Sequence, residues 1–357
     1  MTLPSPYRIQ PPDEAVGQVS LLDLPEITFR GATQFTGMAC RDMYGELPLG
    51  LFVLPDAEVR HDSGYIYTAS SRPILQQNAG FLRKKKFLRP RYPVENNTTA
   101  NAATIEDSIS LLSSCHDCFW HWMGDSLPKV VLAEECGFTG SYLIPAPDVA
   151  PWARESLRLV GIPAHRIVVH HGETVRVSRL SIPTYFCGYN AHFNIPFVRI
   201  YREWVRRSVP HTETVTPKRL FVGRRHSAEA RRVLNQRDLE RLVHEFGFVT
   251  VYFEDLPLAE QLALAVSAEA IIAPHSSGLA HLLFMDEDAL VIELFPHKRQ
   301  QSCDCYETLA RVTPHRYCAL ESELPREGDI EVSLARLRAE LEFLKKSNSG
   351  VITQARI

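Results

Sequence analysis

The sequence predicts an α/β protein with two parallel-sheet halves, a β-rich segment before them and a helix after them. From about residue 100, short apolar runs typical of buried strands alternate with amphipathic stretches typical of helices. This alternation favours parallel sheets with helices on both faces. The polar stretch HTETVTPK, 211–218, separates the halves as a linker. Since ligands bind outside the carboxyl ends of such strands, the two halves suggest a cleft between domains.

Four regions follow from this interpretation: a β-rich N-terminal segment, 1–95; an α/β domain, 96–209; a second α/β domain, 210–325; and a helix with a tail, 326–357. The first region contains GLFVLPDAEVRHDSGYIYTAS, in which apolar and polar residues alternate between turn residues. Such alternation is typical of strands joined in hairpins.

The first α/β half contains three predicted helices and three predicted strands. Gly137 and Gly161 follow two of the helices in the usual stop position, and Asn194 is a suitable N-cap for the third. The predicted helices are 125–138, 150–162 and 194–209, and the predicted strands are 140–146, 166–171 and 175–183.

The second half alternates more clearly. Asn235 is expected to cap a helix that ends at Gly247. The predicted strands are 219–223, 248–253, 269–275 and 288–295, and the predicted helices are 235–247, 256–270, 276–285 and the terminal 333–346.

Composition sets broad bounds on function. The chain has 357 residues, of which 45% are hydrophobic and 23% charged, so it can bury a sizeable core. The net charge of −3 gives no global field that favours nucleic acid. The first residues lack an apolar signal region, and no run approaches the roughly 20 apolar residues that span a bilayer. We therefore expect a cytoplasmic protein.

Two local features carry open alternatives. The basic and aromatic stretch around 83–91 suits peripheral contact with an anionic membrane, or a polyanionic acceptor, or is a plain solvated loop. The cysteine pairs Cys115/Cys118 and Cys303/Cys305 could be zinc ligands or a redox pair. Their irregular spacing favours reduced structural thiols.

The second half offers two groups suited to an anion. His275, Ser276, Ser277 and Gly278 lie where a buried strand meets a helix, and the first amides of a helix attract negative charge. Arg224 and Arg225 follow another strand, where guanidinium groups could clamp a diphosphate. For the 275–278 turn the alternative is a serine that caps a helix. For the arginines the alternative is a solvated basic loop, which suits the following pair, Arg231 and Arg232, better than Arg224 and Arg225.

Two further segments carry polar groups in apolar surroundings. Glu293 ends an apolar strand, where a carboxylate needs a partner such as a ribose diol or a buried arginine. In CFWHWMGDSLPKV, 118–130, His121 and Asp125 are four residues apart and share one face if the segment is helical. Asp125 could accept a proton from a hydroxyl, or simply cap a helix.

Together these segments resemble glycosyltransferase family 61. The family's aromatic-His-Trp-x-x-Asp-x-x-Pro pattern is matched by 119–128. A strand with a basic loop and Asn-Glu is matched by 220–236, with Gln236 in place of the acid. A Glu-Gln pair, a His-Gly-Ala-Gly-Leu turn and a strand ending in Glu are matched by Glu260-Gln261, by 275–279 with Ser276 in place of the first glycine, and by Glu293.

The resemblance implies a GT-B fold of two Rossmann-like domains facing a cleft, and an inverting transfer that uses no metal cofactor. It implies that Arg224, Arg225 and the 275–278 turn bind the diphosphate of a nucleotide-sugar donor, and that Glu293 binds its ribose or sugar. Asp125 is the first choice as catalytic base and His121 the second.

In this interpretation the aromatic residues of 118–130 are partly packing and partly an acceptor-side wall for the sugar, with Trp120 and Trp122 as the wall residues. The expected partners are the donor and a glycan or lipid-linked glycan acceptor of capsule or lipopolysaccharide synthesis, with the protein cytoplasmic or peripheral at the inner membrane. Two other functions stay open: a non-catalytic nucleotide or glycan binder, and a metal-dependent hydrolase that uses His116, Asp117, Cys118 and His121.

Overall fold

The computed structural model describes residues 23–42, 45–60, 64–70, 74, 103–113, 116–184, 193–209, 216–224, 231–296, 304–322 and 328–349. The chain divides into two compact units, Met1–Val209 and Pro210–Ile357, and both combine helices with sheets, which confirms the mixed α/β class. Arg225 and the basic stretch 83–91 lie outside the described residues.

Unit 1 is built on a seven-stranded sheet in the order β1-β4-β9-β6-β7-β8, with β5 paired to β4. Strands β9, β6, β7 and β8 are parallel neighbours, whereas β4 is antiparallel to β9, to β1 and to β5. The strands are β1 (Thr28–Arg30), β2 (Ala39–Asp42), β3 (Gly45–Pro48), β4 (Leu51–Arg60), β5 (Tyr65–Tyr67), β6 (Ala103–Ser110), β7 (Ser141–Pro145), β8 (Ile167–His170) and β9 (Val175–Pro183).

Strands from both predicted regions of unit 1 therefore share one sheet. Leu54 of β4 lies opposite Leu180 of β9, and both belong to an apolar core cluster that β5, β6 and β7 also flank. Strands β2 and β3 pair only with each other among the described strands.

The helices of unit 1 include a group that packs together, α3 with α4 and α5. Asn194 caps α5 as predicted, because its Oδ1 accepts the amide N–H of Phe197 at 3.0 Å. The helical segments are η4 (Thr33–Phe35), α2 (Phe119–His121), η7 (Trp122–Ser126), α3 (Leu127–Glu135), α4 (Pro151–Leu159), η8 (Ala164–Arg166) and α5 (Ile195–Ser208).

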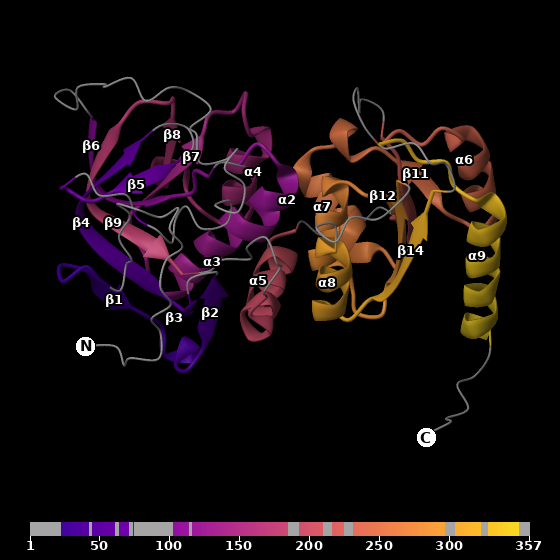
Figure 1. Cartoon of the computed structure of the whole chain (residues 1–357), viewed down its shortest axis with the longest axis horizontal. Coiled ribbons are helices and arrows are strands. Elements are labelled where there is room, and N and C mark those ends of the chain that lie inside the picture. Colours follow the sequence, from indigo (N-terminus) through magenta and orange to yellow (C-terminus); the bar gives the residue numbers. More distant parts are fainter. Residues whose placement is uncertain are drawn as a thin grey trace. The chain divides into compact units, whose positions relative to one another are not determined.

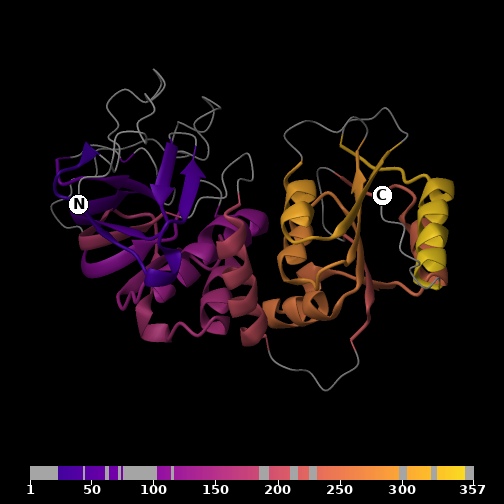
Figure 2. The ribbon, with the colours of Figure 1, turned by 90° about the horizontal axis from the view of Figure 1, so that it is seen from below.

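Unit 2 is a five-stranded parallel sheet in the order β11-β10-β12-β13-β14. Helices α7 and α8 cover one face of this sheet, and α6 and α9 cover the other (Figures 1 and 2). The strands are β10 (Arg219–Val222), β11 (Val249–Val251), β12 (Ala270–Pro274), β13 (Leu290–Phe295) and β14 (Arg316–Glu321). The helical segments are α6 (Gln236–Glu245), η9 (Phe253–Asp255), α7 (Leu258–Ser267), η10 (Ser277–Phe284), α8 (Cys305–Val312) and α9 (Leu334–Ser349).

Local signals of unit 2 are partly confirmed. Gly247 follows α6 with φ 78°, a left-handed conformation that suits the predicted stop. Asn235 makes no capping bond; its side chain instead donates to the carbonyl of Val332 at 2.8 Å and accepts that residue's amide at 3.0 Å. The predicted helix 276–285 is a 3₁₀ helix, η10. Among the described residues, no helix is both long and apolar enough to cross a membrane.

The η10 helix contains a buried histidine whose charge state is linked to stability. His281 is buried, its Nδ1 lies 2.8 Å from the carbonyl of Gly278, and its ring packs on Phe253 with centroids 4.2 Å apart. Burial lowers the pKa of His281 from 6.5 to about 4. The unfolded chain therefore binds this proton more readily than the folded unit.

We predict that His281 stabilises unit 2 fully above pH 6.5 and that this contribution is lost as pH falls toward 4. From the pKa difference, wild type should lose about 3 kcal/mol more than His281→Gln over this range. The measurement is urea unfolding at pH 7, 6, 5 and 4, with the exposed His244→Gln as control. All four tryptophans lie in unit 1, so tryptophan fluorescence reports the unfolding of unit 1 alone. Far-ultraviolet circular dichroism reports both units, and the part of its change that does not coincide with the fluorescence change reports unit 2. Equal pH profiles in wild type and His281→Gln would contradict the prediction.

Candidate functional site

The strand order of unit 2 creates a candidate ligand-binding edge between β10 and β12. The chain leaves β10 for β11 on one side and later returns to β12 on the other, so the order reverses there. In open α/β sheets, ligands bind outside the carboxyl ends of the strands at such a switch point. Arg224 follows β10 and His275 follows β12. The fold thus brings to one edge two groups that the sequence singled out separately.

The His275 ring, at the end of β12, is held by hydrogen bonds that continue through β13 to β14. Its Nδ1 contacts Oε1 of Glu293 on β13, and the hydroxyl of Tyr317 on β14 donates to Oε2 of Glu293 at 2.5 Å. The ring stacks on Phe295 with centroids 4.9 Å apart and meets Tyr306 edge-on at 5.3 Å. These contacts fix the ring orientation at the start of the 275–278 turn.

Glu293 takes a different position from the one expected of a ribose ligand. Its side chain is 0% exposed, and its two carboxylate oxygens contact His275 and Tyr317. Neither of these two partners is the buried arginine that was the alternative. In this structure Glu293 acts on the site through His275.

The cationic part of the edge contains Arg224 and Arg231. Burial and the nearby charge of Arg231 lower the pKa of Arg224, while Glu254 and Tyr306 oppose this. Arg231 has φ 66° and donates from Nη1 to the carbonyl of His275 at 3.0 Å. Two guanidinium groups that repel each other in partly buried surroundings are a favourable place for an anion.

The second arginine of the later pair has a structural partner. Arg232 forms an ion pair with Asp329, from Nη2 to Oδ2 at 2.7 Å, and the backbone of 232–234 runs beside Ile330. The solvated-loop interpretation does not describe Arg231, because its guanidinium donates to the carbonyl of His275. The only sign of this role in the sequence was the position of Arg231 between a strand and the Asn-Gln start of a helix.

The turn after His275 does not use the Ser276 side chain as a helix cap. Ser276 is extended, with φ −158°, and makes no side-chain cap bond to η10. Ser276, Ser277 and Gly278 are all half-buried. A Cβ built on Gly278 would approach other atoms no closer than 3.5 Å, an ordinary contact. Packing within the chain therefore does not require glycine at 278.

The residue that replaces the family's acid, Gln236, has a clear local role. Its Nε2 donates to Glu240 at 2.8 Å and to the hydroxyl of Tyr252 at 3.0 Å. Tyr252 packs against the end of β10, where a Cβ on Gly223 would lie 2.6 Å from its ring. A glutamate at 236 would set a second carboxylate beside Glu240, so the amide is the compatible group here.

In unit 1, His121 and Asp125 form a pair on a widened helical turn. Helix α2 continues into the π-helical turn η7 and then α3, and the amide of Leu127 bonds the carbonyl of Trp122 five residues back. His121 Nδ1 lies 2.8 Å from Asp125 Oδ2, and the two side chains are 24% and 25% exposed. The predicted shared face is confirmed. The helix begins at Phe119, so Asp125 is not its N-cap.

This pair also follows a switch point. In the parallel part of the unit 1 sheet, β9 and β7 flank β6, and the chain enters the 111–126 segment directly after β6. The pair therefore lies beyond the carboxyl end of β6, the edge at which α/β sheets bind ligands. Figure 1 shows α2 and α3 in magenta.

Two residues hold the widened turn from neighbouring helices. The hydroxyl of Tyr201 on α5 donates to the carbonyl of Met123 at 2.7 Å, and the indole N–H of Trp122 donates to Ser156 Oγ on α4 at 2.8 Å. Burial raises the pKa of Tyr201 well above its ordinary value, so the hydroxyl stays a donor.

The acceptor-side role expected of Trp122 is wrong in this structure, because its side chain is 0% exposed and packs as core. Trp120 is 9% exposed and lies under Gly124.

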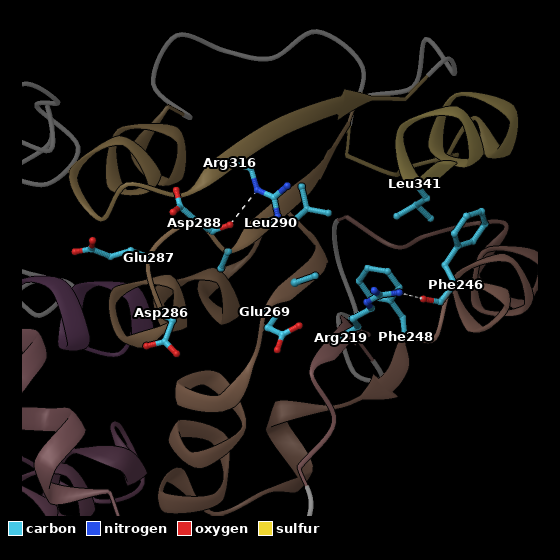
Figure 3. A pocket seen from close by; sticks show the side chains of 12 residues that line it. Arg219, Phe246, Phe248, Glu269, Asp286, Glu287, Asp288, Leu290, Arg316 and Leu341 are labelled. Atoms are coloured by element: carbon cyan, nitrogen blue, oxygen red, sulfur yellow. Dashed lines mark hydrogen bonds between the residues drawn. The ribbon is translucent and has the colours of Figure 1, made fainter. Parts of the chain in front are cut away.

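A hollow of about 200 Å³ lies at the opposite edge of the unit 2 sheet (Figure 3). It is lined where strands begin: Arg219 opens β10 and bonds the carbonyl of Phe246, and Arg316 opens β14 and bonds that of Asp288. It is therefore separate from the Arg224–His275 edge. Across the described ranges, no three His, Cys, Asp or Glu side chains are grouped so that they could hold a metal ion.

Parallel α/β units with polar groups beyond the carboxyl ends of their strands define a class of ligand-binding proteins. Within this class, residues 119–292 match the family model described as glycosyltransferase 61. This region, just under half of the chain, contains both the His121–Asp125 pair and the Arg224–His275 edge, and through it the chain is similar to glycosyltransferase family 61.

Curated relatives agree with this similarity. The chain is 29% identical over 130 residues to the EGF domain-specific O-linked N-acetylglucosamine transferase of Drosophila melanogaster, covering 35% of this chain and 24% of the relative. The proteins of the same name from Gallus gallus and Rattus norvegicus are 31% and 32% identical over 96 and 91 residues, about a quarter of this chain and 17% of each relative. The chain thus spans a quarter or less of these relatives' length.

We predict that Tyr201→Phe lowers the stability of unit 1 by about 1 kcal/mol, because a buried hydrogen bond to Met123 is lost. The measurement is urea unfolding followed by tryptophan fluorescence. Ser208→Ala is the matched control: its hydroxyl also donates from α5 to a backbone carbonyl, that of Trp204 at 2.9 Å, but within its own helix. Equal effects of the two substitutions would contradict a special role for Tyr201.

Proposed function

We propose that this chain is an inverting, metal-independent glycosyltransferase that moves a sugar from a nucleotide-sugar donor to a hydroxyl of a glycan acceptor. The observation that carries the proposal is the placement of two complementary groups at switch points, a cationic edge in unit 2 and a carboxylate with its histidine in unit 1. Both lie within the family 61 match.

The unit 2 edge is assigned to the donor. Arg224, Arg231 and the 275–278 turn, through its amides after His275, bind the diphosphate, and Arg225 is expected to contribute as well. As the bond between the anomeric carbon and the diphosphate breaks, negative charge grows on the leaving group. Fixed guanidinium groups and amide donors stabilise that charge without a metal.

The unit 1 pair is assigned to the acceptor. The Asp125 carboxylate accepts the proton of the acceptor hydroxyl. At the same time the hydroxyl oxygen attacks the anomeric carbon opposite the leaving diphosphate, which inverts that centre. His121, 2.8 Å away, orients the carboxylate; His121 as the base is the alternative assignment. The reaction requires Asp125 to meet the donor sugar, so the proposal includes the GT-B arrangement of two domains that the family resemblance implies.

The name of the relatives makes N-acetylglucosamine the first donor sugar to test. The expected acceptor is a glycan or lipid-linked glycan of capsule or lipopolysaccharide synthesis. The expected location is the cytoplasm or the inner membrane surface, with 83–91 as the membrane contact. Trp120 is retained as a candidate acceptor contact.

The donor site is tested by ligand-dependent stability. A ligand that binds only the native state raises its melting temperature. We predict that UDP or another nucleoside diphosphate raises the melting temperature of wild type equally with and without EDTA, and that Arg224→Met abolishes this rise. Arg219→Met is the matched control, because Arg219 begins the same strand, β10, at its opposite end. A rise that is lost with EDTA would contradict the metal-independent site.

The base is tested by substitution at Asp125. We predict that Asp125→Asn lowers release of nucleoside diphosphate from UDP-N-acetylglucosamine and other nucleotide-sugars by about 100-fold or more, because a positioned base contributes that much. Donor binding measured by the melting shift should stay unchanged. The exposed Asp117→Asn is the control. Normal turnover in Asp125→Asn together with loss in His121→Asn would assign the base to His121. Binding without any turnover in wild type would favour the non-catalytic binder.

A further inference from the structure

A buried lysine lies one turn beyond the His121–Asp125 pair. Lys129 is in α3, four residues after Asp125, so His121, Asp125 and Lys129 follow one another along one helical face. Lys129 is only 8% exposed, although a lysine head group normally stays in water. Sequence reasoning missed it because a lysine in the first turns of an amphipathic helix is usually solvated.

The surroundings of Lys129 act on its charge in opposite directions. Burial lowers the pKa of Lys129, while the charges of Asp125 on its own helix and of Cys40 on β2 act in the opposite direction. From α5, the hydroxyl of Tyr201 is already bonded to Met123. A buried cation is costly unless an anion compensates it, and Asp125 is the carboxylate whose charge acts on it.

We propose that Lys129 is a positioning residue for Asp125: from inside unit 1 it places a positive charge one helical turn from the carboxylate, while His121 contacts the carboxylate from the more exposed side. This inference rests on the proposed function, in which Asp125 accepts a proton. In general, a buried ammonium group near a carboxylate favours the charged form of that carboxylate.

The first arm of the test does not depend on catalysis. The His121 ring is titrated by NMR in the full chain without substrate, and its resonance is assigned by its loss in His121→Asn. In Lys129→Met, the removal of a nearby positive charge should move the His121 titration to higher pH. Lys218→Met, which removes a lysine charge from unit 2, should leave it unmoved. An unmoved titration in Lys129→Met overturns the inference whatever the enzyme does.

The second arm is the pH dependence of kcat/KM with the nucleotide-sugar that wild type turns over. Lys129→Met should move the acid limb to higher pH, so that at pH 5.5 its rate relative to that at pH 8 falls at least about three-fold below the wild-type ratio. Lys129→Arg, which keeps the charge, should restore the limb. If the NMR titration moves and the acid limb does not, Lys129 is not a positioning residue for the reaction.

The two arms separate failure of this inference from failure of the proposed function. If wild type turns over no nucleotide-sugar, the proposed function fails, and the NMR arm still decides whether Lys129 acts on the pair. If Lys129→Met does not fold, judged by its far-ultraviolet circular dichroism, Lys129→Gln carries the same expectations in both arms.

Discussion

The candidate sites depend on one constraint: parallel strands that run together must end at the same edge of their sheet. In unit 2 the fully buried strand β12 lies directly beside β10, so the residues that follow them meet there although they are far apart in the chain. The connections leave β10 and β12 in opposite directions along the sheet, which keeps the edge between them open. In unit 1 the same reversal lies at β6, ahead of the segment that carries Asp125.

The edge of unit 2 is stiffened by a buried carboxylate. Glu293 would be costly inside an apolar strand if its charge had no partners. His275 and Tyr317 supply them from the neighbouring strands β12 and β14, and the result is a continuous hydrogen-bonded line across three strands. This explains why a glutamate occurs within VIELF, and it orients the residue that opens the 275–278 turn, the proposed anion site. The carboxylate contributes through geometry, since its own oxygens face protein groups.

Features encoded by local periodicity were predictable, and features encoded by tertiary contact were not. The alternation of strands and helices, the cap at Asn194 and the stop at Gly247 follow from neighbours in sequence. Asn235 has the composition of a cap, yet it pairs with Val332, which no local pattern indicates. The His121–Asp125 pair follows from helical spacing, whereas Tyr317 reaches Glu293 from a strand later in the chain.

The burial of Trp122 and the exposure of Asp125 have a common cause in the widened turn. In an α-helix, residues three apart are separated by about 60° around the axis and share a face. A buried tryptophan at 122 would then draw Asp125 toward the core. In the π-helical turn each residue advances by a smaller angle, so three residues fall further short of a full circle and the two side chains diverge.

Residues four apart remain close to a full circle, so His121 keeps its contact with Asp125. The turn thus separates a packing residue from a polar one within a single helix, while the hydroxyl of Tyr201 supports it from α5. A sequence pattern based on a regular helix would assign Trp122 and Asp125 to the same wall, whereas the widened turn leaves Trp122 in the core.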